Sequence, residues 1–548
     1  MVNLLWGLGF ANAILLVRGL AAQYWSGWGG STFNNRWARN NTDISSSTIS
    51  KLTEHCSISH PIGVSATPVI HDNIAYYPTW DGTFAAVNYE ICRTLWEVNV
   101  TEIVEGHAPA SPSQAKYTRA VSRTSPQIDG DVLFFGTLMH ALVVALNRTT
   151  GETLDTIQIN SHQFAVVTQS PTFFDGKLLI GASSSEHLAA QDPSYDCCSF
   201  IGNFVGLSFS PTDGFKLEWN ADNIPTWRTR DGWSGAPVWG SQPSIDAQRN
   251  RVYIGTGNSY SIPQLVAECL EAYNVSSLDR SKPDPCLTSD VWQDSVVAID
   301  IDSGVVMWAY QSPRIDAFSA TCGFPGFPPA DPALCPELEA AGLDQDFGMA
   351  PTFVPGSHLG DIVVAARKDG FVYALSASDG RVLWSTSAGP PGGAGGISWG
   401  VAVDDSSLYY AAINSDNVEW RLSGSNKTTS RSAYGAISLA DGAIKWQTPV
   451  PREGVCYAPP SVVGDLVLVA RTGEDPKGDS SYDQTQGSLV VLDKSTGQVL
   501  SEIVLSSNTH SGIAIQDEFV LLGTGYDGFS TQATLPGGFH VFKIESKK

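Results

Sequence analysis

Short runs in which apolar and polar residues alternate recur along this chain, each followed by a turn. In two of them, residues 75–87 and 363–375, the halves of the run are separated by Asp81-Gly82 and Asp369-Gly370. An Asp-Gly pair between two alternating runs is a strong signal for a β-hairpin. A repeat containing helices would show apolar residues at a spacing of 3.6, and we do not find that spacing. The pattern predicts an all-β protein.

A longer repeat joins these hairpins: a β-rich segment, a turn, an apolar strand, then Asp or Ser, three residues, Gly, three residues and Trp. The clearest copies pair Gly304 with Trp308, Gly380 with Trp384 and Gly442 with Trp446. Degenerate copies end at Trp96, Asp155, Trp219 and Ser501. The turn position recurs at intervals of roughly 55 to 90 residues, a length that suits a four-stranded blade with long loops.

Seven copies of this repeat are visible, and strands at 519–522 and 539–544 remain outside them. Together with a strand near residues 50–60 they would complete an eighth blade, because closing a ring with both chain ends leaves no exposed sheet edge. We therefore predict one eight-bladed β-propeller over residues 23–548. Each Trp of the repeat is expected to be core and to pack between neighbouring blades.

Composition narrows the function. The formal net charge is −23, and only 16% of the residues are charged. A strongly acidic protein is repelled by nucleic acid and by anionic membrane surfaces, so neither is an expected partner. The composition fits a protein that acts on small neutral molecules. The oligomeric state cannot be inferred from the sequence.

The first residues resemble a secretory signal. An apolar run from Leu4 to Val17 is followed by the small residues Gly19, Ala21 and Ala22, so residues 1–22 are expected to be removed. A membrane anchor is the alternative, but the run is shorter than the ~20 residues of a span, and no later segment is apolar enough. Five Asn-x-Ser/Thr sequons favour a secreted glycoprotein; they are at Asn40, Asn99, Asn147, Asn274 and Asn426.

Nine cysteines are spaced as a disulfide framework would be. Cys56 and Cys92 flank the first repeat, and Cys197 and Cys198 are adjacent and could be bonded to each other. Two further pairs bracket insertions near residues 259–290 and 320–345; they are Cys269 with Cys286 and Cys322 with Cys335. Cys456 would be left over. No paired C-x-x-C pattern indicates zinc, and no C-x-x-C-H indicates an attached haem.

Four groups of motifs carry a resemblance to a known family. They are Trp25-Ser-Gly-Trp-Gly-Gly with Asn34-Asn-Arg; Thr168-Gln-Ser-Pro with Gly181-Ala-Ser-Ser-Ser-Glu186 and Cys197-Cys198; Trp239-Gly-Ser-Gln-Pro with Gly255-Thr-Gly-Asn258 and Arg314-Ile-Asp316; and Asp346-Phe-Gly with Lys368-Asp-Gly and Trp399-Gly. Across nearly all of the mature chain, the sequence resembles the alcohol dehydrogenases that depend on the quinone PQQ, especially the polyvinyl alcohol dehydrogenase-like branch.

The resemblance implies a cofactor pair, PQQ and Ca²⁺, on the propeller axis. The positions that match the family's metal ligands are Glu186, Asn258 and Asp316, and hard oxygen ligands suit Ca²⁺. Asp316 also matches the catalytic base that takes the proton of the substrate hydroxyl. The implied reaction is oxidation of an alcohol or polyol, with electrons passed to a separate acceptor.

Five further positions match cofactor contacts in the family. Trp239 matches the aromatic floor beneath the quinone, and Lys368 matches the basic residue that bonds the quinone oxygens. Thr168 and Arg123 match contacts to the cofactor's carboxylates and carbonyls, and Trp399 is expected near the axis.

Two other functions remain open at this stage. The propeller could have lost PQQ and catalyse a redox-neutral step on a small molecule, or it could be a binding protein without catalysis. Individually, these residues also have ordinary structural interpretations: Asn258 as a turn cap, Trp239 as core, and Glu186 and Lys368 as surface residues. The shape of the axial pocket separates the possibilities.

Overall fold

The computed structural model describes residues 24–273, 285–322, 335, 344–474, 486–526 and 535–545. The expected signal peptide, the sequon at Asn274 and parts of both insertions lie outside the described residues. In the part of the chain described, no helix is both long enough and apolar enough to cross a membrane.

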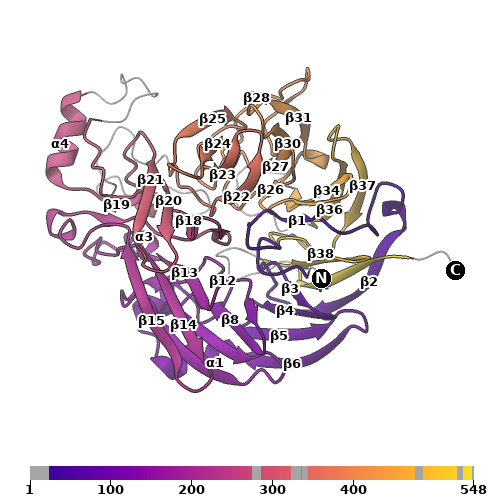
Figure 1. The fold of residues 1–548 in the computed structure, drawn as a ribbon, viewed down its shortest axis with the longest axis horizontal. Helices are drawn as coiled ribbons and strands as arrows, with labels where there is room; N and C mark the ends of the chain where they lie inside the picture. The colour runs from indigo at the N-terminus through magenta and orange to yellow at the C-terminus, as the bar shows by residue number, and fades with distance from the viewer. Residues whose placement is uncertain are drawn as a thin grey trace, which may run out of the picture.

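Eight four-stranded antiparallel sheets are arranged in a ring (Figure 1). Within each of the first four blades, the strands are paired in chain order. These blades are β3 to β6 (Val69–His71, Ile74–Pro78, Thr83–Asn88, Arg93–Asn99); β7 to β10 (Gln127–Asp129, Val132–Gly136, Leu142–Asn147, Thr153–Gln158); β12 to β15 (Thr172–Phe174, Lys177–Ser184, Asn203–Ser210, Gly214–Asp222); and β17, β18, β20 and β21 (Ser244–Asp246, Arg251–Gly255, Ser295–Asp300, Val306–Gln311).

The next three blades repeat the pattern. They are β22 to β25 (Thr352–Ser357, Gly360–Ala366, Phe371–Ser376, Val382–Ser387); β26, β27, β30 and β31 (Ala402–Val403, Ser407–Ala412, Ala433–Ser438, Ile444–Pro449); and β33, β34, β36 and β37 (Ser461–Val463, Leu466–Arg471, Ser488–Asp493, Val499–Val504). First strands surround the centre of the ring, and last strands face its rim (Figure 1).

The eighth blade is built from both ends of the described chain, as the sequence predicted. It contains β38 (Ala514–Gln516), β39 (Phe519–Thr524), β40 (Gly538–Ile544) and, as its outer strand, β2 (Leu52–Ser59). β2 and β40 are antiparallel. The predicted eight-bladed, all-β propeller is therefore confirmed.

The repeated Trp and Gly join neighbouring blades. Gly380 has a φ of +72°, and a Cβ there would lie 2.4 Å from the ring of Trp308 in the preceding blade. The indole N–H of Trp308 donates to the carbonyl of Ala377, 3.1 Å away in that same turn. Four other blade pairs share this contact between an indole and a positive-φ glycine; they are Trp96 with Gly151, Trp219 with Gly304, Trp384 with Gly442 and Trp446 with Gly497.

One degenerate repeat has a clear physical substitute. Asp155 stands where Trp would be, and its carboxylate accepts a hydrogen bond of 2.7 Å from the backbone N–H of Phe215 in the next blade. A Cβ on Gly214, whose φ is +73°, would lie 2.2 Å from that carboxylate. The blade junction is therefore kept with a polar contact in place of an indole.

The segment before β1 (Trp37–Ala38) contacts the innermost strands of five blades. Carbonyls of residues 25–36 accept hydrogen bonds from backbone N–H groups in β3, β17, β22, β26 and β33; the donors are Ile70, Ile245, Phe353, Val403 and Val462. Buried Arg36 adds bonds from its guanidinium to the carbonyls of Pro460 and Ile513. This explains why the N-terminal motif is rich in Gly, Asn and Trp: the backbone itself makes the contacts.

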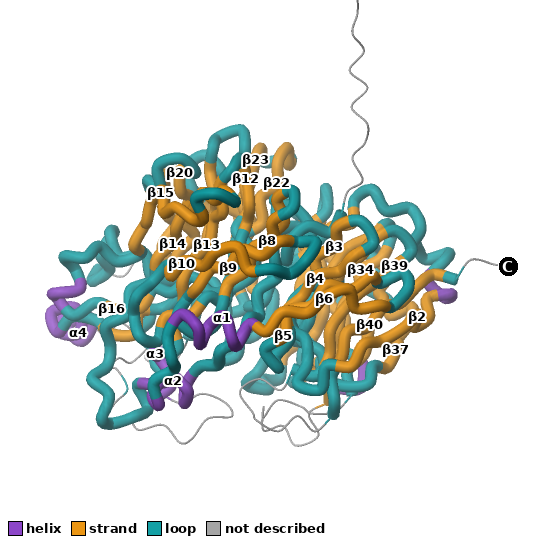
Figure 2. Tube along the Cα trace, turned by 90° about the horizontal axis from the view of Figure 1, so that it is seen from below, coloured by secondary structure: helices purple, strands orange, loops and turns teal. Residues whose placement is uncertain are grey.

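Four disulfides join the cysteines in the predicted pairs, and Cys456 is buried and free. Four short α-helices were not predicted. They are α1 (Val100–His107), α2 (Pro112–Tyr117), α3 (Glu186–Ala189) and α4 (Gln264–Tyr273), and they lie toward one face of the ring (Figure 2).

Replacing the blade-joining glycine should cost more than replacing an equally twisted glycine in open space. We expect Gly380→Ala to lower the free energy of unfolding by about 3 kcal/mol, from left-handed backbone strain plus overpacking against Trp308. Gly176 has a φ of +75° and nothing within 4 Å of the point where a Cβ would lie, so Gly176→Ala should cost only about 1 kcal/mol. Urea unfolding of both variants tests this, and equal losses would contradict the packing role.

Candidate active site in the axial cavity

A cavity of about 460 Å³ lies on the axis of the propeller. Each blade, or the loop that enters it, contributes to its wall; one such residue per blade, in chain order, is Trp80, Leu138, Ser184, Asn258, Lys368, Trp399, Tyr457 and His510. Its volume is within the range of small-molecule and cofactor sites. Phe318 is part of the wall and leaves the cavity open.

Trp239 forms a fixed flat surface in this wall. Its indole N–H donates to Asp346 Oδ2 at 2.9 Å, and the ring of Trp399 stands edge-on to it with centroids 5.3 Å apart. Gly348 lies directly against the ring, since a Cβ there would be 2.7 Å from it. These contacts hold the indole in one orientation, as a stacking surface for a planar ligand requires.

Cationic side chains face the same space. The Nζ of Lys368 is 5.1 Å from the Trp239 ring centroid and 2.7 Å from Asp344 Oδ1. Burial alone would lower the pKa of Lys368, but Asp344 and Asp346 outweigh it and keep the pKa above its usual value. The guanidinium of Arg123 lies 5.4 Å from the ring centroid of Trp399.

The remaining predicted cofactor residue is also at the wall. Thr168 lines the cavity, and its hydroxyl donates to the backbone carbonyl of Trp239 at 2.8 Å. Two cations that sequence reasoning missed, Lys116 and Arg119, complete the basic part of the wall; both follow from α2, which the sequence did not reveal.

Asn258 and Asp316 are brought together by their backbones. Asn258 lines the cavity, and the carbonyl of Asp316 accepts a hydrogen bond of 3.0 Å from the N–H of Ser259. Asp316 is buried behind the wall: Oδ2 accepts from the N–H of Gln345, and Oδ1 has no partner among the described residues. Burial raises the pKa of Asp316 to about 7.

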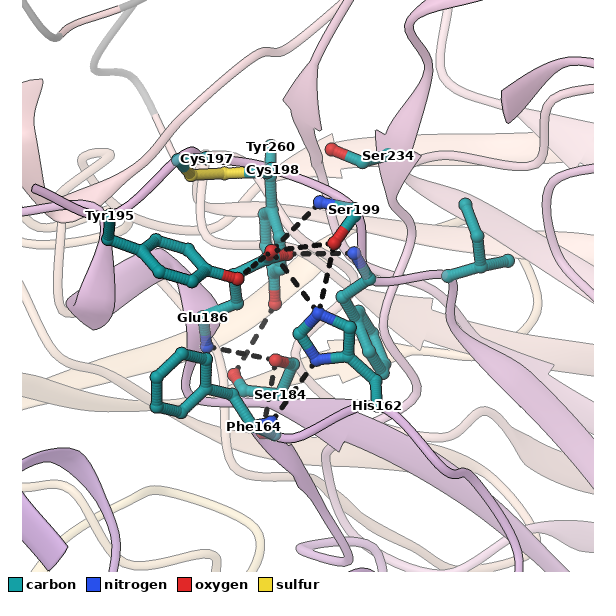
Figure 3. Close-up of polar contacts among 12 residues, drawn as sticks. His162, Phe164, Ser184, Glu186, Tyr195, Cys197, Cys198, Ser199, Ser234 and Tyr260 are labelled. Atoms are coloured by element: carbon teal, nitrogen blue, oxygen red, sulfur yellow. Dashed lines mark hydrogen bonds and ion pairs between the residues drawn. A yellow bond between two sulfur atoms is a disulfide. The ribbon is translucent and has the colours of Figure 1, made fainter. Parts of the chain in front are cut away.

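Glu186 begins α3 and is enclosed by donors (Figure 3). Its Oε1 accepts from the Tyr195 hydroxyl at 2.7 Å and from the Ser199 N–H at 2.8 Å, and Oε2 accepts from the Phe200 N–H at 2.9 Å. The Nε2 of His162 is 3.3 Å from Oε1. This nitrogen carries the ring hydrogen, because Nδ1 accepts a hydrogen bond from the backbone of Phe164.

As placed here, Glu186 does not fit the metal-ligand role that the resemblance gave it. Burial raises its pKa, but the hydrogen bonds from His162 and Tyr195 outweigh burial and lower it overall. Among the described residues, Ser185 and His187 line the cavity and Glu186 does not. The sulfurs of Cys197 and Cys198 are close to its carboxylate, but they are bonded to each other and so are not thiolate ligands. The physical reason is the loop 195–200, whose donors take up the carboxylate.

Comparison with known proteins agrees with this arrangement. The family model for the β-propeller domain of glucose, ethanol and alcohol dehydrogenases matches residues 25–320, more than half of the chain. The chain belongs to this dehydrogenase family. A second family model, for the outer membrane protein assembly factor BamB, matches residues 293–521 of the same ring.

Relatives within the family include two polyvinyl alcohol dehydrogenases. The protein from Sphingopyxis sp. (strain 113P3) is 26% identical over 436 residues, and that from Pseudomonas sp. is 24% identical over 436. Both matches cover 78% of this chain, and 59% and 60% of the relatives. The chain therefore spans about three fifths of the length of these curated relatives. The family that the motifs indicated is confirmed.

Solved structures agree on the fold. The quinohemoprotein alcohol dehydrogenases ADHIIG of Pseudomonas putida HK5 and of Comamonas testosteroni each superpose with a TM-score of 0.67 at 15% identity. Each superposition covers 96% of this chain and 81% of the other. At this identity the likeness concerns the propeller alone.

An aromatic group, also missed from the sequence, forms another part of the cavity wall. His510 stacks on Tyr457 with centroids 5.2 Å apart and meets Tyr526 edge-on, and Tyr526 stacks on Trp80. Burial, followed by the charge of Arg123, lowers the pKa of His510 to about 3. The imidazole is therefore neutral at physiological pH and acts as part of an aromatic wall.

This buried histidine should make stability depend on pH. Its pKa is lower in the folded state than the ordinary 6.5, so between pH 6.5 and about 3 the unfolded state binds the proton and stability falls as pH falls. Relative to His510→Gln, we expect the wild type to lose about 1.4 kcal/mol per pH unit inside this window. Thermal unfolding at a series of pH values measures the difference. His358, which is exposed, supplies the control variant His358→Gln, and an identical profile for both variants would contradict the assignment.

Proposed function

We propose that this protein is a quinoprotein oxidoreductase that oxidises an alcohol or polyol hydroxyl group in the axial cavity. The observation that carries the proposal is the fixed indole of Trp239 in a cavity also lined by Lys368 and Arg123. Family membership supports it, and the relatives named as polyvinyl alcohol and quinoprotein ethanol dehydrogenases indicate a hydroxyl substrate.

The residues fit PQQ, which is planar and carries three carboxylates. Trp239 offers a flat face, and four cationic side chains line the cavity: Lys116, Arg119, Arg123 and Lys368. Cations around an aromatic floor suit an anionic planar ligand. When bound, PQQ supplies a two-electron acceptor for the hydride of the alcohol carbon.

The chain's own residues would handle the proton and the charge. Asp316 Oδ1, buried and without a partner among the described residues, would accept the hydroxyl proton from a substrate that enters past Asn258. Lys368 remains protonated beside Asp344 and would stabilise negative charge that develops above Trp239. The aromatic residues His510, Tyr457 and Tyr526 would exclude water from the opposite wall.

The metal part of the family pattern fits less completely. Asp316 has an available carboxylate oxygen, whereas the Glu186 carboxylate is occupied by Tyr195, Ser199 and Phe200. No reaction step is therefore assigned to Ca²⁺ here.

The cellular setting belongs to the same proposal. Four disulfides, the signal-like first residues and the sequons support a secreted glycoprotein. A separate electron acceptor would reoxidise the cofactor, because the chain has no haem attachment motif.

Calorimetric titration with PQQ tests the cofactor assignment directly. The wild type should bind PQQ, and Trp239→Ala and Lys368→Met should each weaken binding at least tenfold, about 1.4 kcal/mol, by removing a stacking surface and a charge-assisted hydrogen bond. Asp316→Asn should keep PQQ binding but lose alcohol oxidation with an artificial electron acceptor.

Trp227→Ala is the matched control, because Trp227 is 54% exposed outside the cavity wall and should not affect binding. A folded wild type that does not bind PQQ would contradict the proposal. It would leave the redox-neutral enzyme and the binding propeller as the remaining functions.

A further inference from the structure

The turn that carries Asn258 gathers three aspartates that are distant in sequence. The N–H of Asp294 donates to the carbonyl of Gly257 at 3.0 Å, and the N–H of Asn258 donates to Asp346 Oδ1 at 2.6 Å. The carbonyl of Asp316 accepts from the N–H of Ser259, the first residue of β19 (Ser259–Ser261). Three consecutive residues of one turn thus hold three acidic residues around Asn258.

Several oxygens in this cluster have no hydrogen-bond partner among the described residues. Asp294 is 0% exposed, and neither of its carboxylate oxygens has a partner. Asp316 is 3% exposed, and its Oδ1 has none. The two amide hydrogens of Asn258 bond the carbonyls of Ser259 and Phe318, so its Oδ1 remains available as a ligand. Buried carboxylate oxygens without donors are rare, and they call for a ligand.

The charges of the cluster are also out of balance. Four buried carboxylates, on Asp294, Asp316, Asp344 and Asp346, share this region with only Arg367 and Lys368. Lys368 is paired with Asp344 at 2.7 Å, and Arg367 is paired with Asp369 at 3.1 Å. If all four are ionised, at least two negative charges are uncompensated, and burial of unpaired carboxylates is very unfavourable.

A proton and a cation would relieve this imbalance differently. One proton shared between Asp294 and Asp316 would satisfy two oxygens and leave a third without a partner. A divalent hard cation would accept all three carboxylate oxygens and the amide oxygen of Asn258 while supplying two positive charges.

We propose that Asp294, Asp316 and Asn258 form a site for a divalent hard cation such as Ca²⁺, with Asp294 in the place that the family resemblance gives to Glu186. Glu186 instead anchors the loop that carries the Cys197–Cys198 disulfide (Figure 3). Because Asn258 lines the cavity, the cation would reach a bound ligand there, with water or that ligand completing its coordination. The site does not depend on the proposed quinone chemistry.

Titration of the whole, chelator-treated protein with Ca²⁺ alone tests this site. Wild type and Glu186→Gln should bind Ca²⁺ with affinities within about threefold of each other, and binding should raise their unfolding temperature. Asp294→Asn and Asp316→Asn should bind at least tenfold more weakly and lose that rise. Calorimetry and thermal unfolding provide the two readouts, and neither requires PQQ or activity.

The metal-free proteins provide an independent sign. Without Ca²⁺, Asp294→Asn should unfold at a higher temperature than the wild type, because it removes an uncompensated buried charge; a purely structural aspartate would give the opposite result. Asp404, a buried aspartate bonded to the N–H groups of Ser406 and Ser407, provides the control Asp404→Asn, which should keep the Ca²⁺-induced rise. Loss of Ca²⁺ binding in Glu186→Gln with retention in Asp294→Asn would overturn the proposal, as would a folded wild type that binds no Ca²⁺. Because the titration omits the quinone, its outcome is independent of the PQQ test.

Discussion

The contact between an indole in one blade and a left-handed glycine in the next sets the geometry on which the rest of this structure depends. In the junction of Trp308 with Gly380, the ring fills the space that a side chain would occupy, and its N–H ties the two blades at one carbonyl. Repetition of the same contact fixes the separation and the angle of neighbouring blades. A fixed angle closes eight sheets into a ring, and the ring determines how much space is left on the axis.

The axial space concentrates polar groups because the inner ends of eight blades converge there. Asp346 connects three parts of the site: it accepts from the indole of Trp239 and from the backbone of Asn258, and it lies 3.5 Å from Lys368. A shift of that one carboxylate would move the aromatic floor, the oxygen-rich turn and the main cation together. The floor, the turn and the charge are therefore best regarded as one rigid unit.

Much of the fold could be predicted because each repeat carries its own local physics. A glycine that must adopt positive φ and an indole four residues later are visible in sequence, and so are cysteines that bracket a loop. The resemblance also predicted the cavity positions of Trp239 and Lys368, because each follows a strand whose register the repeat fixes. The helices α1 to α4 escaped notice because they are too short to show a clear helical period.

The site could not be predicted where the outcome depends on partners distant in sequence. The position of Glu186 matched a motif, but the spacing of a motif does not reveal that loop 195–200 turns back and occupies the carboxylate. Asp294 precedes an apolar strand and looks like an ordinary turn residue. Only the folded chain shows that it shares a turn with Asp316 and Asp346, which are 22 and 52 positions further along.

The closure of the eighth blade also bears on how the ring is assembled. Leu52 pairs with Ile544, so β2 emerges early in synthesis, and its partner β40 emerges some 490 residues later. Contacts of such sequence separation form late, since the entropy of closing the loop must first be overcome. The Cys56–Cys92 bridge, with a separation of 36 residues, ties β2 to the first blade over a much shorter loop. The early strand is thereby kept beside the first blade as a template edge, and addition of the last hairpin to it completes the ring.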